Sequence, residues 1–227
     1  MNFVFDVDGT LTPSRDKMDE DFKKFFLSFC TRNPVYLITG SDYPKTVEQV
    51  GEEVCFAVEG VYNCSGNMLT RRDVVMYMND FELLDVERIV LESELRTSGF
   101  PVRTGNHIEK RIGCVNFSIV GRNAGKPERE QYKVWDEATF ERKRICDFLN
   151  RHFTRLECVI GGETGIDIFL KGKDKSQIVQ YVKPFVFFGD RCEVGGNDHT
   201  IFKLANNGYH VKDWQETYRI LKAMGTR

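Results

Sequence analysis

Short apolar runs alternate with amphipathic stripes at the start of the chain. The run at 2–6 contains Phe3, Val4 and Phe5 in succession and predicts a strand buried on both faces. Such strands belong to parallel sheets that helices cover. The elements expected here are strands at 2–6, 35–39 and 54–58 and helices at 18–29 and 44–51. This alternation predicts right-handed crossovers and a doubly wound sheet.

The pattern changes after about residue 70. Asn79 and Glu82 have the spacing of a capping box, which predicts a helix that ends at Gly99. The segment 114–120 alternates apolar and polar residues, as a half-buried strand of an antiparallel sheet does. Asp136 is in a position to cap a further helix. Three more strands are expected at 108–111, 156–160 and 166–170.

The alternation of buried strands and helices that marks the start of the chain returns after a turn at 172–175. It predicts helices at 178–182, 200–205 and 217–224 and strands at 185–188 and 209–211. The predicted fold is therefore α/β, with a doubly wound parallel-sheet (Rossmann-like) core. Residues 1–79 and 172–227 form this core, and an α+β insert with an antiparallel sheet occupies 80–171.

Composition narrows the function classes. Lys and Arg total 32 and Asp and Glu total 34, giving a net charge of −2. A sequence-independent nucleic-acid binder would show a basic excess, so no nucleic acid is expected as a partner. No apolar run approaches the ~20 residues that span a bilayer, so no membrane is expected either. The seven cysteines are odd in number and lack Cys-x-x-Cys spacing, which favours reduced thiols and a cytoplasmic location.

Two carboxylates follow the first predicted strand. Asp6 and Asp8 precede Gly9 and Thr10 at its carboxyl end, the edge where open α/β sheets bind ligands. One carboxylate can attack phosphorus and form an aspartyl-phosphate, while the other passes a proton to the leaving oxygen. The alternative, a merely solvated acidic strand end, is disfavoured by the adjacent apolar run.

A second acidic cluster follows the strand at 185–188. Carboxylates gathered at one sheet edge would repel each other without a hard cation, and Mg²⁺ fits such oxygen ligands. Asp190 is the strongest metal candidate. Asp198 is either a second ligand, direct or through water, or a helix N-cap, and Asn197 competes for that role.

Two weaker motifs complete this edge. Thr39 and Ser41 follow the second strand, where a hydroxyl and backbone N–H groups suit phosphate oxygens, although the same residues are ordinary N-cap material. Lys175 lies where the chain re-enters the core and could neutralise a phosphate, but the residues alone do not choose it over Lys171 and Lys173.

Arginines suggest a second phosphate site in the insert. Arg111 and Arg122 bracket the alternating strand, and Arg129 lies seven residues further on. Guanidinium forks suit phosphate bidentately, although single arginines are common on surfaces. A phosphatase must bind one phosphate, whereas a sugar phosphomutase must hold a second while a bisphosphate turns over. An insert that closes over an aspartyl-phosphate would also keep water out.

Together these motifs resemble those of the haloacid dehalogenase-like superfamily, and the insert resembles its type IIB cap. The likeness narrows to eukaryotic-type phosphomannomutases and covers nearly the whole chain. The segments that carry it are Phe5–Arg15, Arg111–Arg122, Asp167–Lys175 and Phe187–Phe202.

The resemblance implies a phosphomannomutase that interconverts mannose 6-phosphate and mannose 1-phosphate through an aspartyl-phosphate. It implies Asp6 as nucleophile, Asp8 as acid/base, and Ser41 and Lys175 near the transferring phosphate. It further implies Mg²⁺ on Asp6, the Asp8 carbonyl and Asp190, a hexose 1,6-bisphosphate activator, a role in GDP-mannose supply and a homodimer through the cap. The substrate contacts that it implies are Arg15, Arg111, Arg122, Arg129 and Asp167.

Three departures from that family keep a rival open. Gly165 stands where the resemblance implies a substrate-contacting serine, Thr39 where it implies glycine, and Leu204 where it implies an acid of a second cation site. Thr39 and Gly165 favour the rival, a Mg²⁺-dependent sugar phosphatase of the same superfamily. A non-catalytic sugar-phosphate sensor is disfavoured because the acidic and lysine positions are intact.

Overall fold

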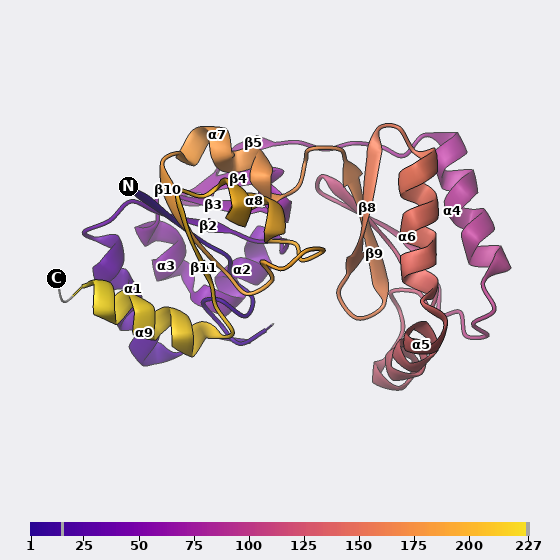
Figure 1. The fold of residues 1–227 in the computed structure, drawn as a ribbon, viewed down its shortest axis with the longest axis horizontal. Coiled ribbons are helices and arrows are strands. Elements are labelled where there is room, and N and C mark those ends of the chain that lie inside the picture. The colour runs from indigo at the N-terminus through magenta and orange to yellow at the C-terminus, as the bar shows by residue number, and fades with distance from the viewer. Residues whose placement is uncertain (15, 226–227) are drawn as a thin grey trace. The chain divides into compact units, whose positions relative to one another are not determined.

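The computed structural model describes residues 1–14 and 16–225 (Figure 1). Contacts within the chain divide it into two compact units. One comprises Met1–Asn79 and Gly172–Arg227, and the other comprises Asp80–Lys171. The roles of the two units as catalytic core and substrate-binding cap stay a prediction.

A seven-stranded sheet forms the first unit, in the order β11-β10-β1-β2-β3-β4-β5. Its parallel strands are β1 (Asn2–Phe5), β2 (Val35–Ile38), β3 (Gly60–Asn63), β10 (Phe185–Gly189) and β11 (Asn207–His210). The antiparallel hairpin of β4 (Met68–Arg71) and β5 (Val74–Met78) extends one edge. Phe5 pairs with both Leu37 and Phe188, so the carboxyl ends of β1, β2 and β10 meet at one edge.

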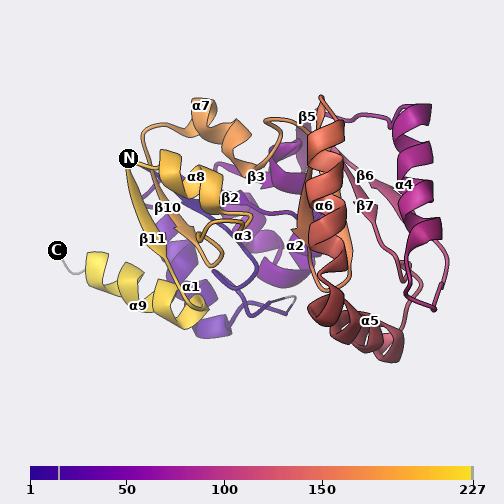
Figure 2. The same cartoon turned by 45° about the vertical axis from the view of Figure 1, so that its right-hand side comes forward.

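Helices cover both faces of this sheet, as the doubly wound prediction requires (Figures 1 and 2). Phe5 packs into a core with Phe22 of α1 and Leu221 of α9. Its neighbour Val4 points into the opposite core, with Ile201 of α8. The helices are α1 (Glu20–Cys30), α2 (Tyr43–Val50), α3 (Glu52–Ala57), α7 (Val179–Val182), α8 (His199–Leu204) and α9 (Trp214–Met224).

The strand predicted at 54–58 is wrong. Residues 54–57 lie in the helix α3, Val58 is the residue that follows it, and the third strand is β3 at Gly60–Asn63. Val54 and Cys55 are buried from one side of that helix, and acidic residues occupy its first turn. A short apolar run fits a buried strand and a short helix equally well, so periodicity alone does not separate them.

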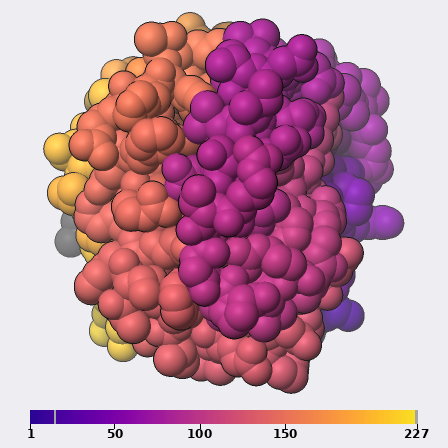
Figure 3. Space-filling model, turned by 90° about the vertical axis from the view of Figure 1, so that its right-hand side faces the viewer, coloured from indigo at the N-terminus to yellow at the C-terminus, as the bar shows by residue number. Residues whose placement is uncertain are grey.

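The second unit contains a four-stranded antiparallel sheet, in the order β6-β7-β9-β8. Its strands are β6 (Ile108–Arg111), β7 (Cys114–Phe117), β8 (Leu156–Gly161) and β9 (Gly165–Leu170). Its helices are α4 (Asp85–Thr97), α5 (Lys126–Thr139) and α6 (Glu141–His152). Figure 3 shows the surface where α4 and α6 lie beside each other, and an ion pair of 3.0 Å joins Arg144 to Glu94 there. Figures 1 and 2 show both helices on the same side of the sheet.

Two expectations for the helices of this unit are corrected. The helix α4 begins at Asp85 rather than near Asn79, and Glu87 accepts the Leu84 N–H at 2.8 Å. Asp136 does not begin a helix but lies inside α5, which was not expected. Its carboxylate nonetheless accepts the N–H of Arg142 in the first turn of α6, at 2.7 Å.

The strand expected at 114–120 is shorter and more buried than its alternation suggests. It ends at Phe117, and the polar residues Asn116 and Ser118 are buried as well as the apolar ones. Over the described residues, no helix is long and apolar enough to cross a membrane.

Candidate active site

A tight turn after β1 places the first pair of carboxylates. The Asp6 N–H continues the sheet by donating to the Phe188 carbonyl at 2.9 Å. The N–H groups of Leu11 and Thr12 then return to the Val7 carbonyl. Gly9 has φ of +81°, and a β-carbon there would collide with the Asp190 carboxylate. Glycine is therefore required for the turn to lie directly against Asp190.

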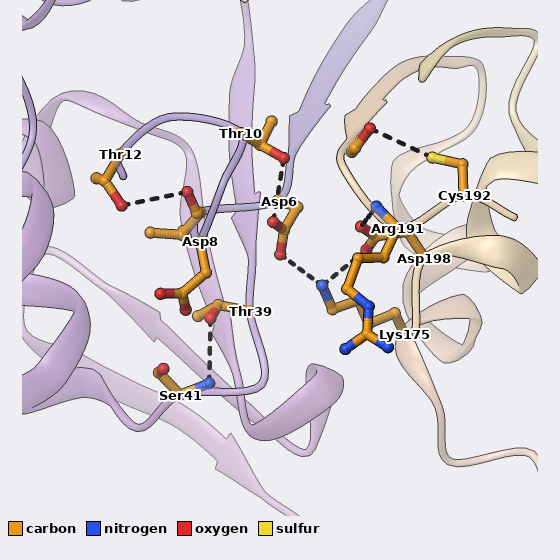
Figure 4. Close-up of polar contacts among 12 residues, drawn as sticks. Asp6, Asp8, Thr10, Thr12, Thr39, Ser41, Lys175, Arg191, Cys192 and Asp198 are labelled. Atoms are coloured by element: carbon orange, nitrogen blue, oxygen red, sulfur yellow. Dashed lines mark hydrogen bonds and ion pairs between the residues drawn. The ribbon is translucent and has the colours of Figure 1, made fainter. Parts of the chain in front are cut away.

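Of the three lysines at 171, 173 and 175, Lys175 is the one that contacts Asp6. Its ammonium is buried and lies 2.5 Å from Asp6 Oδ1 and 2.7 Å from Asp198 Oδ1 (Figure 4). The second Asp6 oxygen accepts the Thr10 hydroxyl at 3.1 Å. Asp6 is thus fixed at both oxygens, with a cation beside it.

Asp198 holds this lysine rather than capping a helix. It occupies the residue before α8, but its side chain makes no cap hydrogen bond. Its carboxylate is fully buried and also accepts the Arg191 N–H at 3.2 Å. Asn197, the competing candidate, is exposed. The structure favours a role for Asp198 in orienting Lys175.

The electrostatics of this cluster call for additional positive charge. Burial raises the pKa of Asp6 to about 8; Lys175 opposes this shift, and Asp198 and Asp190 add to it. Burial and then Asp198 raise the pKa of Asp190 to about 6. Burial disfavours the charged form of Lys175, but the two carboxylates outweigh it and raise the pKa of the ammonium. Three carboxylates therefore share a single buried cation.

A divalent metal fits these residues. Oxygen atoms of Asp6, Asp190 and Asp198 lie within 4.8 Å of one another. Lys175 contacts both Asp6 and Asp198, whereas Asp190 is only half-buried, so Asp190 is the carboxylate that a metal would reach without competing with the lysine. An all-oxygen donor set suits a hard cation such as Mg²⁺. Such an ion would lower both raised pKa values by favouring the ionised carboxylates.

Gln49 is a site residue that the sequence did not reveal. Its amide nitrogen donates to Asp8 Oδ1 at 2.9 Å from the last turn of α2, and the residue is buried. Asp8 is thereby oriented by a side chain 41 residues away. No local motif marks this glutamine, because the contact depends on how α2 packs against the β1 turn.

The residues after β2 lie at the same sheet edge. Thr39 is buried, and its hydroxyl accepts the Ser41 N–H at 3.1 Å, so this N–H is already used (Figure 4). Asp42 caps α2 by accepting the Lys45 N–H at 2.9 Å. Ser41 is half-exposed. Of this motif, its hydroxyl stays the best candidate to reach a phosphate.

A polar row crosses the sheet of the second unit. Glu109 pairs with Asn116 on the next strand, and Asn116 pairs with Asp167 on the strand after that. Directly paired residues project to the same face. The Asn116 amide donates to Asp167 Oδ1 at 2.6 Å. The opposite face carries Val115, Phe117 and Ile166, which belong to the apolar core of this unit.

Arginines gather around this row. The Arg111 Nε and Nη2 donate to Glu109 Oε2 at 2.8 and 2.5 Å, and Arg122 Nε lies 3.3 Å from the same oxygen. Burial lowers the pKa of Arg122, and the positive charges of Arg111 and Arg129 add to that effect while Glu109 opposes it. The structure therefore brings together four of the five predicted substrate contacts. Arg15, the fifth, lies outside the described residues.

Glu109 was not among the site residues predicted from the sequence, although it lies two residues from Arg111 and therefore on the same face of the strand. Gly165 has a structural explanation. A β-carbon there would lie 2.5 Å from the Asn116 amide nitrogen, so the amide fills the space that a serine would need.

Known proteins resemble this chain in sequence over most of its length. Residues 22–226 match the family model described as eukaryotic phosphomannomutase. The phosphomannomutase of Triticum aestivum is 31% identical, with 97% of this chain and 94% of the relative covered. That of Galdieria sulphuraria is also 31% identical, with 95% and 91% covered.

Solved structures share the fold at lower identity. A haloacid dehalogenase-like hydrolase from Bacteroides thetaiotaomicron has a TM-score of 0.61 at 13% identity and covers 98% of both chains. The IMP-bound IMP-nucleotidase of Plasmodium falciparum has a TM-score of 0.65 at 15% identity, covering all of this chain and 68% of the other. These likenesses confirm the predicted fold class, and the sequence matches confirm the predicted family. The chain belongs to the eukaryotic phosphomannomutase family.

Proposed function

We propose that the protein is a phosphomannomutase that interconverts mannose 6-phosphate and mannose 1-phosphate. One observation carries the choice over a sugar phosphatase: each unit has its own cationic centre. Lys175 lies beside Asp6 in the first unit, and Arg122 lies near Arg111, Arg129 and Asp167 in the second. A hexose that passes through a bisphosphate needs two phosphate sites, whereas hydrolysis of a monophosphate needs one. The family assignment supports the same choice.

Asp6 is the proposed nucleophile. Its carboxylate attacks phosphorus and forms a P–O bond, while the bond from phosphorus to the sugar oxygen breaks. Lys175 holds Oδ1 of Asp6 and Thr10 holds Oδ2, so the attacking group is oriented before substrate arrives. Lys175 also places positive charge where the phosphoryl oxygens gain negative charge.

Asp8 is the proposed acid and base. It gives a proton to the departing sugar oxygen and takes one from the sugar hydroxyl that attacks the aspartyl-phosphate in the return step. The hydrogen bond from Gln49 fixes the position of its carboxylate. One proton is given and one is taken, and the phosphoryl group lost from one sugar oxygen is restored at another, so the net reaction is an isomerisation.

Mg²⁺ would bind Asp6, Asp190 and the Asp8 carbonyl, and it would supply charge neutralisation at the transferring phosphoryl group. Ser41 would contact that phosphate through its hydroxyl. Asp198 would keep Lys175 in place.

The second unit is the proposed substrate-binding cap. Arg111, Arg122 and Arg129, together with Arg15, would bind the phosphate that is not being transferred. Asp167 would accept sugar hydroxyls. A hexose 1,6-bisphosphate would prime the enzyme by phosphorylating Asp6. We further propose a homodimer through the cap and a cytoplasmic enzyme that supplies GDP-mannose synthesis.

A coupled assay tests this function. Purified enzyme receives mannose 1-phosphate, Mg²⁺ and a hexose 1,6-bisphosphate, and both mannose 6-phosphate and free phosphate are measured. We expect mannose 6-phosphate to form. Free phosphate without mannose 6-phosphate would instead identify a sugar phosphatase, and omission of the bisphosphate tests its role as activator.

A further inference from the structure

The carboxylate of Glu109 lies among the cap arginines, where a phosphate site would ordinarily exclude negative charge. Its Oε2 accepts both Nε and Nη2 of Arg111 and forms an ion pair with Arg122 Nε. These contacts join two arginines that the proposed function assigns to the sugar phosphate. A residue so placed either competes with the phosphate or prepares the arginines for it.

The atoms that Glu109 contacts distinguish these roles. Glu109 lies at the Nε edge of each guanidinium group: it accepts two hydrogen bonds from Arg111, whereas Arg122 Nε is an ion-pair partner that is buried without a hydrogen bond. Arg111 uses Nε and Nη2 for these contacts, and no hydrogen bond from Arg111 Nη1 or from either Nη atom of Arg122 is found among the described residues. Terminal nitrogens are the part of the fork that can bind phosphate while the other edge is held. A phosphate can therefore bind without displacing Glu109.

Glu109 also lies in a rigid part of the cap. It is on β6, paired with Asn116, which in turn pairs with Asp167 on β9. A carboxylate fixed by a sheet can hold two flexible side chains in one geometry. The charge balance agrees: three guanidinium groups in one cluster repel each other, and Glu109 offsets part of that repulsion.

We infer that Glu109 is a positioning residue for the sugar-phosphate site, which holds Arg111 through two hydrogen bonds and Arg122 through an ion pair so that their terminal nitrogens bind the phosphate. This inference rests on the proposed function and adds to it a residue that acts through the arginines.

The test is a double-mutant cycle on the full chain. The dissociation constant for mannose 6-phosphate is measured by calorimetry for wild type, E109Q, R111A and the double variant. We expect E109Q to weaken binding about tenfold, since a charged hydrogen bond is lost at a half-exposed position. In the R111A background, E109Q should cost less than about threefold, because most of its effect passes through Arg111.

Two further variants separate positioning from charge and from general damage. E109D keeps the charge but is one methylene shorter, so it should also weaken binding. E163Q changes an exposed glutamate in the turn between β8 and β9 of the same unit and should leave binding unchanged. Hydrolysis of p-nitrophenyl phosphate should be equal in wild type and E163Q, which confirms that this control variant is folded.

Specific results would overturn the inference. Tighter binding by E109Q would make Glu109 a competitor of the phosphate, and wild-type binding by E109D would leave only its charge important. An equal loss with and without Arg111 would show that Glu109 acts by another route. If wild type binds mannose 6-phosphate and E109Q does not, but no isomerisation occurs, the proposed function fails and the inference stands. No binding by wild type would overturn both.

Discussion

Replacing Lys175 by methionine gives the strongest test of the core site. The side chain is 1% exposed and lies between two carboxylates at 2.5 and 2.7 Å. Methionine has a similar length, so the substitution removes the charge with little change in volume. Removing one partner of a buried ion pair costs about 3–5 kcal/mol, because the remaining charge has no compensation. At ~2–4 °C per kcal/mol for a chain of this size, the melting temperature should fall by about 10 °C.

The deficit should grow with pH. The pKa of Asp6 is raised from 3.8 to about 8 in the folded protein even beside Lys175. The folded state therefore holds a proton that the unfolded state has lost between those values, and metal-free stability falls as pH rises through this window. Without Lys175 the pKa rises further, so K175M should lose more stability at pH 8 than at pH 5.

The matched control is K173M, in the same turn. Lys173 is half-exposed, so its replacement should change stability by less than ~0.5 kcal/mol. Thermal unfolding followed by calorimetry, without metal at pH 5 and pH 8, measures both variants. Equal stability of K175M and K173M would refute the claim that the buried cation holds this site together.

Three other predictions concern the site. D6N should reduce turnover below about a thousandth of wild type, and higher residual activity would exclude Asp6 as the nucleophile. The melting temperature of D6N should change little, because asparagine resembles the protonated carboxyl and Lys175 keeps its contact with Asp198. R122A should raise KM for mannose 1-phosphate and leave p-nitrophenyl phosphate hydrolysis nearly unchanged; steady-state assays showing equal losses on both substrates would argue against a distal phosphate site. Mg²⁺ should bind at least about tenfold more weakly at pH 5 than at pH 8, because the carboxyls of Asp190 and Asp6, with pKa values of about 6 and about 8, must first lose their protons; calorimetric titration giving the same affinity at both pH values would contradict this.

Helices and strands were predicted correctly where the hydrophobic pattern fitted only one kind of secondary structure. The continuous apolar residues of β1 indicated a strand with helices on both sides, and Val4 and Phe5 do enter opposite cores. Prediction failed at 54–58, where the run is too short to show a period. It also failed for α5, whose apolar positions are sparse among charged ones.

The residues of the candidate site likewise fall into two groups, those that the sequence identified and those that depend on the folded structure. Asp6 and Asp190 were identifiable because they directly follow apolar strands, and parallel strands bring such residues to one edge. The choice of Lys175 over its neighbours, and of Asp198 as its partner, depends on the path of the chain between β9 and β10. Gln49 and Glu109 make their contacts through side-chain packing, which no spacing rule encodes.

The Asn116 amide occupies the space into which a side chain at position 165 would project. Substitutions at positions 116 and 165 therefore depend on each other. Any larger residue at 165 must first turn that amide aside, and turning it breaks the hydrogen bond that steadies Asp167. A serine introduced alone would therefore disturb Asp167, the proposed sugar contact, before it could add a contact of its own. Gain of a serine hydroxyl at position 165, in evolution or by engineering, would need a compensating change at position 116. If the serine came first, the single variant would be a poorer enzyme than either the starting protein or the double variant.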